Sequence, residues 1–484
     1  MREKAITATV WSAVGLWGHQ GVALLVFLLL AKLLKPEDFG LVALASVYIA
    51  FVGVFVEQGF LEAIIQRRNI AQEHLDTAFW TNLGLSLALT IACIVTAPLV
   101  GRFFGEPRLK EVITGLSAVF IIAGISGVPK ALLRRGFLFR SLALASVVGT
   151  IAGGIAGIVM AWRGHGVWAL VAYQLVTRGS ESTLLWFFNE WRPHLSFSRS
   201  HFRELFRFGI SVTGSRVLNF FNKHLADLVI GFFLGPVALG LYTVAFRLIR
   251  TIVTLFGGVI SQVSLSIFAE KQDQKDSLRS AYYNLTRYVS LIAFPLFAGI
   301  LVTAPVLVDV LFSEQWVEAI PIMRVLALIG IVHSLGYLDA SVLIGCGRPQ
   351  WRMCIDLLNV VGNLVGMLLV IRWGIVAVAW AYVIRGYLLS PIPFLAVVKL
   401  SGARISTYLR IVFPIAVSSV LVAAAAASIP FLLRSHPSVI VLTCQALSGI
   451  LVYIVSIRLF FPALFKEVVG QGLFTIRLVL KGIS

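Results

Sequence analysis

Charged side chains recur at helical spacing inside apolar stretches of this chain. In the first stretch, Arg216, Asn219, Lys223 and Asp227 are separated by three, four and four positions. Steps of three and four place side chains on one face of a helix, although the surrounding segment LNFFNKHLADLVIGFF is mostly apolar. Asp227 follows Lys223 by one helical turn, and this spacing predicts an ion pair between them.

Two other segments carry polar stripes of the same kind. One consists of Thr243, Arg247, Arg250 and Thr254, and the other consists of Gln174, Arg178 and Glu181. Each charge at the centre of a bilayer costs at least ~3 kcal/mol. The stripes are therefore expected to face a water-filled cavity or one another. For Arg178 and Glu181 the spacing favours a structural ion pair.

The cations of the first two stripes are candidates for binding an anion, and they are Arg216, Lys223, Arg247 and Arg250. Arginine matches phosphate oxygens in bidentate geometry, and lysine supplies a point charge. The alternative is architectural, because buried pairs such as Lys223 and Asp227 often fix helix packing. Both interpretations remain open at the level of the sequence.

Two acids could carry a coupling proton, namely Glu57 and Asp227, because both lie inside apolar segments. The nucleotide-binding pattern GxxxxGK[ST] is absent from the sequence, so ATP is not expected to drive the protein directly. The four cysteines are scattered without CxxC or histidine pairing. They are expected to be small buried hydrophobes, and the sequence predicts no metal or other cofactor.

Long apolar runs must position these residues. Of 484 residues, 59% are hydrophobic and 13% are charged, with a mean hydropathy of +0.93. The apolar runs are continuous rather than alternating, which predicts membrane helices and excludes a β-barrel. The fourteen predicted spans are 10–34, 40–65, 78–100, 112–133, 141–162, 167–188, 209–234, 237–263, 288–312, 320–345, 353–371, 375–398, 411–433 and 439–460. The sequence therefore predicts an all-α polytopic membrane protein.

The net charge of +18 fits the basic loops of a membrane protein better than a nucleic-acid surface. With the N-terminus placed in the cytoplasm, 23 Lys and Arg residues fall on the cytoplasmic side and 7 on the opposite side. This bias predicts that both termini are cytoplasmic. The loops are too short and too apolar to hold a catalytic domain, so the protein is not expected to be an enzyme.

An internal repeat connects the two halves of the chain at an offset of about 200 residues. LLKPEDFGLVALA (33–45) aligns with FLGPVALGLYTVA (233–245), LLRRGFLFRSLALASVVG with VLIGCGRPQWRMCIDLLNVVG, and GVWALVAY with GIVAVAWAY. The order of the matches predicts two six-helix halves, 1–200 and 201–400. Residues 401–484 would add two transmembrane helices and an amphipathic tail. Repeats of this kind place a transport site between the halves.

The pattern of six, six and two spans resembles the multidrug/oligosaccharidyl-lipid/polysaccharide exporter superfamily. DLVIGFFLGPVALGLYTVAFR (227–247) is similar to a segment characteristic of its polysaccharide transport branch, the Wzx-like flippases. VEQGFLEAIIQRRNI, TAFWTNL and RRGFLFR also fit that branch. The resemblance implies a protein of the bacterial inner membrane that moves undecaprenyl-diphosphate-linked oligosaccharide repeat units to the periplasmic leaflet, through a cationic cavity, by alternating access.

The same resemblance implies a role in making capsule, exopolysaccharide or O-antigen lipopolysaccharide, with polymerase and export proteins as partners. On that view the isoprenoid tail stays in lipid while the four cations receive the diphosphate. Two alternatives stay open. A drug or cation antiporter of the superfamily would favour an acidic cavity, whereas these stripes are net basic. A polytopic glycan polymerase or ligase would carry a large periplasmic loop, which the sequence lacks.

Overall fold

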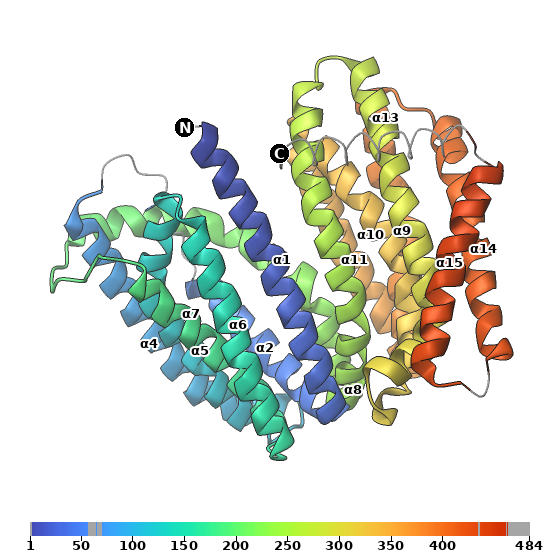
Figure 1. Ribbon diagram of the computed structural model, residues 1–484. Helices are drawn as coiled ribbons and strands as arrows, with labels where there is room; N and C mark the ends of the chain where they lie inside the picture. The colour runs from blue at the N-terminus through green and yellow to red at the C-terminus, as the bar shows by residue number, and fades with distance from the viewer. Residues whose placement is uncertain (1, 57–63, 65–69, 434–435, 461, 463–484) are drawn as a thin grey trace, which may run out of the picture. The chain divides into compact units, whose positions relative to one another are not determined.

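The computed structural model of the protein describes residues 2–56, 64, 70–433, 436–460 and 462. Across these residues the secondary structure is α-helix with two short 3₁₀ turns, and no strand occurs among them. The described parts of the predicted spans lie on helices (Figure 1), and 375–398 is divided between two helices by a turn at Ser390. The predicted all-α polytopic fold is therefore confirmed.

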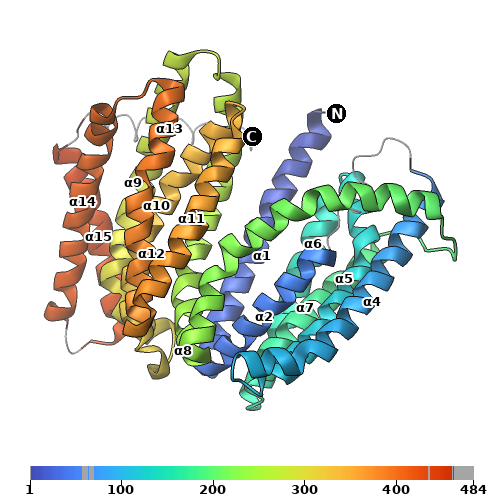
Figure 2. The same ribbon diagram turned by 180° about the vertical axis from the view of Figure 1, so that it is seen from behind.

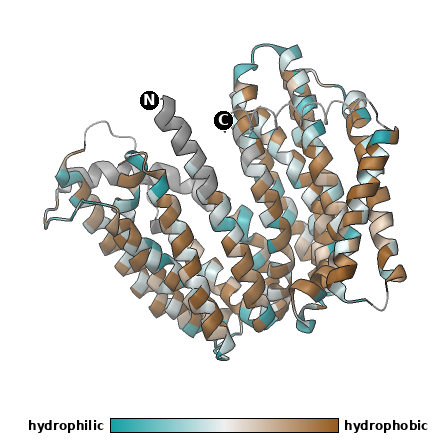
Figure 3. Ribbon diagram, in the orientation of Figure 1, coloured by the Kyte–Doolittle hydropathy of each residue, from teal (hydrophilic) through white to brown (hydrophobic). Residues whose placement is uncertain are grey.

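Twelve helices within the described residues are long and apolar enough to cross a membrane. The difference from the fourteen predicted spans has two sources. α7, which carries Arg178 and Glu181, is not among the twelve, and the predicted spans 209–234 and 237–263 share a single helix, α8. Hydrophobic residues run along the helices, and hydrophilic ones gather at loops and helix ends (Figure 3). Many apolar side chains on these helices are exposed, as expected for surfaces that face lipid.

The chain divides into two compact units, one formed by Met1–Val244 with Val360–Ile375, and one by Ala245–Asn359 with Val376–Ser484. The helices of the first unit are α1 (Arg2–Leu33), α2 (Pro36–Val56), α4 (Gln72–Phe103), α5 (Leu109–Arg135), α6 (Phe139–Trp162), α7 (Val167–Phe187) and the beginning of α8 (Arg199–Glu270). Within it, α6 packs between α1 and α7, and α5 packs against α2, α4 and α7 (Figures 1 and 2).

The rest of α8 and the following helices belong to the second unit, except that Val360–Ile375, the end of α11 with η2, belongs to the first. The helices that follow α8 are α9 (Lys275–Leu311), η1 (Glu314–Trp316), α10 (Ala319–Gly345), α11 (Pro349–Val370), η2 (Ile371–Trp373), α12 (Ile375–Leu389), α13 (Pro391–Ser401), α14 (Ile405–Leu432) and α15 (Ser438–Phe460). α9 is central here, because it packs against α10, α14 and α15. The predicted amphipathic tail lies outside the described residues.

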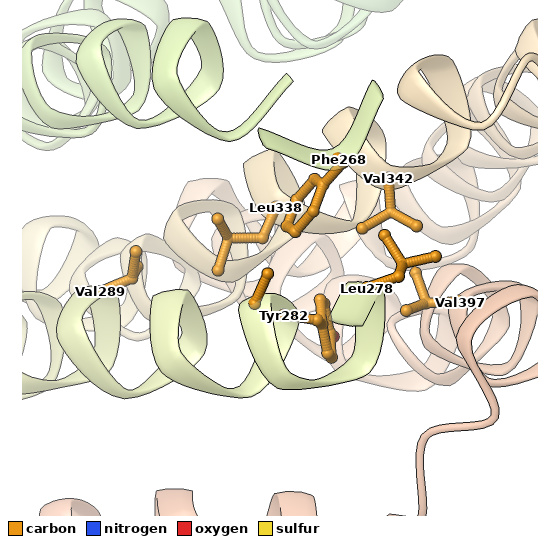
Figure 4. Close-up of a cluster of buried hydrophobic side chains, with 8 residues drawn as sticks. Phe268, Leu278, Tyr282, Val289, Leu338, Val342 and Val397 are labelled. Atoms are coloured by element: carbon orange, nitrogen blue, oxygen red, sulfur yellow. The ribbon is translucent and has the colours of Figure 1, made fainter. Parts of the chain in front are cut away.

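A buried cluster holds α9 to its neighbours in the second unit (Figure 4). Its members are Phe268, Leu278, Ala281, Tyr282, Val289, Leu338, Val342 and Val397. Tyr282 also donates a hydrogen bond of 2.7 Å to the buried carboxylate of Asp339. A buried carboxylate is costly unless it is hydrogen-bonded, so this contact ties α9 to α10 through polar as well as apolar groups.

α8 breaks at Gly235, whose φ of 79° lies in the region that favours glycine. Pro236 follows and starts the second helical segment, just as Pro36 starts α2. Proline suits the first position of a helix because it has no N–H to leave unbonded there. In both copies of the first repeat match, the shared proline is therefore the first residue of a helix.

The repeat also explains a close contact inside the first unit. A Cβ added at Gly40 would lie 1.7 Å from the carbonyl oxygen of Pro236, and one added at Gly240 would lie 1.8 Å from that of Pro36. The contact is thus reciprocal between the two copies of the sequence. Glycine at both positions lets the two helix starts approach to backbone distance, as small residues do between membrane helices.

Candidate functional site

The predicted site residues on α8 lie in both units. Lys223 is exposed and Asp227 is partly buried, and both precede the Gly235 break. Arg247 is partly buried and Arg250 is exposed, and both follow the break. All four fall within the apolar stretch Phe220–Leu255, which qualifies as a membrane span. Charged and exposed side chains thus occur in a helix whose composition suits lipid.

Two predicted site residues lie outside what the structure describes. Glu57 is outside the described residues, and the side chain of Arg216 on α8 is outside them as well. The role of Glu57 in coupling and that of Arg216 in anion binding therefore stay predictions.

The predicted pair of Lys223 and Asp227 is wrong. Among the described residues, Asp227 pairs with His224, whose Nδ1 lies 3.4 Å from the carboxylate, and Lys223 has no acidic partner. Two physical reasons account for this. A cation placed four residues before an acid is the less favourable orientation on a helix, and the His224 imidazole lies within pairing distance of the carboxylate.

A second charged group lies in the first unit, around Glu181 on α7. Lys130 Nζ on α5 lies 2.8 Å from Glu181 Oε1, and Arg178 Nη1 lies 3.6 Å from Glu181 Oε2. The Glu181 side chain is only 13% exposed, against 33% for Lys130 and 59% for Arg178. Arg178 and Glu181 are neighbours as their spacing indicates, but the shorter contact is made by Lys130.

Lys130 was missed by sequence reasoning. A signal was present, since Lys130 is a lone cation in the predicted span 112–133. Its partner is 51 positions away, and no spacing rule connects residues of different helices. The contact is structural in kind, because it joins α5 to α7 at a position mostly shielded from solvent.

We expect Lys130→Ala to destabilise the protein by about 1–3 kcal/mol, because it leaves Glu181 without its nearest cation. Arg178→Ala should cost less than ~1 kcal/mol, since that pair is longer and Arg178 is largely exposed. The melting temperature of the detergent-purified protein measures both effects. The double variant Lys130→Ala with Glu181→Ala should recover part of the loss; a double variant less stable than Lys130→Ala would contradict the pairing.

The second unit contains a polar group that the sequence analysis did not single out. Arg385 on α12 donates a hydrogen bond of 2.5 Å to Asn359 Oδ1 on α11, and its guanidinium lies 5.0 Å from the ring centre of Tyr382. The Tyr382 hydroxyl lies 3.4 Å from His333 Nε2 on α10. Phe246, the neighbour of Arg247, packs edge-on against the same tyrosine ring at 5.7 Å.

These contacts bring four helices of the second unit together around Tyr382, namely α8, α10, α11 and α12. The group supplies a fixed guanidinium, an imidazole, an amide and a hydroxyl. Such groups suit hydrogen bonding to a polar ligand. Among the described residues no group of three or more His, Cys, Asp or Glu side chains could hold a metal ion.

Comparison with known proteins places this geometry in a family. Residues 29–321 match the family of polysaccharide biosynthesis proteins. The chain is 28% identical over 352 residues to the lipopolysaccharide biosynthesis protein WzxC of Escherichia coli, covering 72% of this chain and 71% of that one. It is 24% identical over 385 residues to the teichuronic acid biosynthesis protein TuaB of Bacillus subtilis, covering 79% and 80%.

A solved structure of the lipid II flippase MurJ in an inward closed conformation shares the fold. The TM-score is 0.75 at 15% identity, over 94% of this chain and 99% of that one. The segment that matches the family, residues 29–321, includes all of α2 and α8. It therefore contains the Asp227–Arg247 stretch that carries the resemblance. The chain belongs to the polysaccharide biosynthesis protein family, whose model matches well over half of its residues.

Proposed function

We propose that the protein moves undecaprenyl-diphosphate-linked oligosaccharide repeat units across the bacterial inner membrane for the synthesis of a surface polysaccharide. Family membership supports a transport role in polysaccharide synthesis rather than an enzymatic one. Two relatives are named for the synthesis of lipopolysaccharide and teichuronic acid. A solved protein of the same fold is named for flipping lipid II.

The observation that carries this proposal is the presence of exposed cations in a stretch apolar enough to span a membrane. Lys223 and Arg250 are exposed within Phe220–Leu255, and Arg247 is partly buried there. A cation in such a position is costly unless water or an anion compensates it. A diphosphate supplies that compensation with several oxygens, which arginine can bind in pairs. In the proposal these three residues, with Arg216, bind the diphosphate while the isoprenoid tail remains in lipid.

We propose further that transport proceeds by alternating access of two helical bundles around a cationic cavity. The break at Gly235 supports this mechanism, because a helix interrupted at glycine and proline can change direction without losing many hydrogen bonds. Glu57 and Asp227 are the candidates for coupling this motion to an ion gradient, whereas Arg178 and Glu181 are assigned a structural ion pair. The Asp227 carboxylate lies 3.4 Å from His224 Nδ1.

The experiment that tests the function uses the purified protein in lipid vesicles. A fluorescent lipid-diphosphate oligosaccharide is placed in one leaflet, and its appearance in the other is followed by quenching. We expect accelerated flipping with the protein and none with the bare vesicles. Collapse of proton and sodium gradients then tests coupling. Flipping no faster than in protein-free vesicles, with protein shown to be folded and inserted, would contradict the proposal.

The orientation is a separate proposal, with both termini in the cytoplasm. It implies that the short connection after α14, around Pro437, is periplasmic. A reporter that is active only in the periplasm should be active when inserted at Pro437 and inactive when fused after Ser484. A periplasmic signal from the C-terminal fusion would overturn the predicted topology.

A further inference from the structure

A pocket of about 350 Å³ lies between the beginnings of α9 and α14, within the second unit. Three of its lining residues on α9 are Ser280, Asn284 and Arg287, separated by steps of four and three. These steps give one face of the helix. The other face, with Leu278, Tyr282 and Val289, is buried in the cluster of Figure 4. α9 thus divides its surface between a packed core and this pocket.

α14 contributes the opposite wall with a similar arrangement. Thr407, Arg410 and Pro414 follow at steps of three and four, and Ile411 and Ile415 complete the lining on this side. The polar residues come first along the helix and the apolar ones later. Since the helix rises about 1.5 Å per residue, Thr407 and Ile415 are about 12 Å apart along it. One end of the pocket is polar and the other is apolar.

Each of the two arginines directly precedes a long uncharged stretch of its helix. After Arg287 the residues 288–308 carry no charge, and after Arg410 the residues 411–433 carry none. Twenty helical residues cross the hydrocarbon core, so each arginine directly precedes the part of its helix that spans it. Arg287 is partly buried and Arg410 is exposed, and no acidic side chain lines the pocket among the described residues.

Hydrogen bonding between Tyr283 on α9 and the Arg404 backbone joins the two walls of the pocket. The Tyr283 hydroxyl accepts a hydrogen bond of 2.6 Å from the backbone N–H of Arg404 and lies 3.3 Å from its carbonyl oxygen. Arg404 directly precedes α14. The start of α14 is therefore held against α9, and Arg287 and Arg410 line the same pocket.

We propose that this pocket is a binding site for an anionic phospholipid. Its two arginines would bind the phosphate, its hydroxyl and amide groups would bond the polar head, and Ile411, Pro414 and Ile415 would contact the first acyl carbons. Basic pockets between membrane helices are suited to anionic lipids of the cytoplasmic leaflet. The loops at this end are the ones that the charge bias assigns to the cytoplasm. The proposal concerns a bilayer lipid and does not depend on the transported substrate.

Binding of phosphatidylglycerol to the full purified chain tests this site, measured by native mass spectrometry from detergent. In Arg287→Gln with Arg410→Gln, we expect affinity to fall about thirtyfold, since each arginine near an anionic surface gives a factor of about five. Arg287→Lys with Arg410→Lys should lose less, because the charge stays and the fork is lost. Arg324→Gln with Arg372→Gln, two exposed cations outside the pocket, should bind as the unchanged protein does.

Further arms identify the ligand. Phosphatidylcholine should bind weakly to every variant, and millimolar inorganic phosphate should not displace phosphatidylglycerol. Equal affinity of the glutamine variant and the unchanged protein would overturn the site. Displacement by inorganic phosphate would show a free-phosphate site instead. Tighter, arginine-dependent binding of undecaprenyl diphosphate would show a substrate site. If the glutamine variant fails to elute as a single species, the lysine variant compared with the Arg324 and Arg372 control decides the outcome.

Discussion

Gly40→Ala is expected to remove almost all folded protein from the membrane, and Gly240→Ala should do the same. The added methyl group of the first variant would lie 1.7 Å from the carbonyl oxygen of Pro236 and 2.5 Å from its carbonyl carbon. Both are backbone atoms at a helix start, so no side-chain rotation relieves the clash. Overpacking of flexible side chains already costs 1–3 kcal/mol, and we expect at least ~3 kcal/mol here.

The measurement is the yield of monodisperse protein in size-exclusion chromatography of a fluorescent fusion. Gly21→Ala on α1 and Gly84→Ala on α4 are the matched controls, because a Cβ at either position meets no atom within 4 Å. Both controls should keep the normal yield or exceed it, since alanine favours a helix by up to ~1 kcal/mol over glycine. A normal yield of Gly40→Ala would show that α2 and α8 do not meet as described.

Removing the cations of α8 is expected to abolish polysaccharide export while leaving the protein folded. Hydrogen bonds to charged groups contribute about 1.5–3 kcal/mol, so Arg247→Gln should slow export by about tenfold to a hundredfold. Arg247→Lys keeps the charge without the bidentate fork and should retain partial activity. Lys223→Ala and Arg250→Gln should add to the loss, and both side chains are exposed, so their removal strands no buried group.

Surface polysaccharide in a strain lacking its own flippase provides the measurement, corrected for the amount of protein in the membrane. Arg324→Gln, which removes an exposed cation of α10, is the control for a general charge effect. The His224–Asp227 pair makes the test of Lys223 simpler, because Lys223→Ala leaves Asp227 with its imidazole partner. Normal polysaccharide in a well-expressed strain lacking Arg216, Lys223, Arg247 and Arg250 would refute the cationic mechanism.

The helices were predictable from the sequence because a bilayer restricts the backbone conformations that a spanning segment can adopt. A continuous apolar run that must satisfy its own backbone becomes a helix, and all fourteen predicted ranges fall on helices where they are described. The break at Gly235 and Pro236 was marked by the residues themselves. The repeat match around Gly40 and Gly240 also carried spatial information, since the matched glycines turned out to be the contact residues.

The partners of charged residues were not predictable in the same way. Helical spacing placed Arg178 beside Glu181, but the closest cation is Lys130 on another helix. Helical spacing places both Lys223 and His224 near Asp227, and the structure pairs the acid with the histidine. The hydrogen bond from Arg385 to Asn359 also joins two helices. Packing decides such contacts, and a single sequence has no rule for residues that meet only after the helices associate.

The reciprocal glycine contact has a consequence for biosynthesis. Gly40 enters the membrane early, but Pro236 and Gly240, which cover it, are made about 200 residues later. At about 5–20 residues per second, the ribosome needs about 10–40 s to supply them. During that interval the start of α2 lacks the segment of α8 that packs against Gly40. A chain truncated before residue 236 can never supply that segment, so α2 cannot reach its final packing before the part of α8 that follows the Gly235 break has been made.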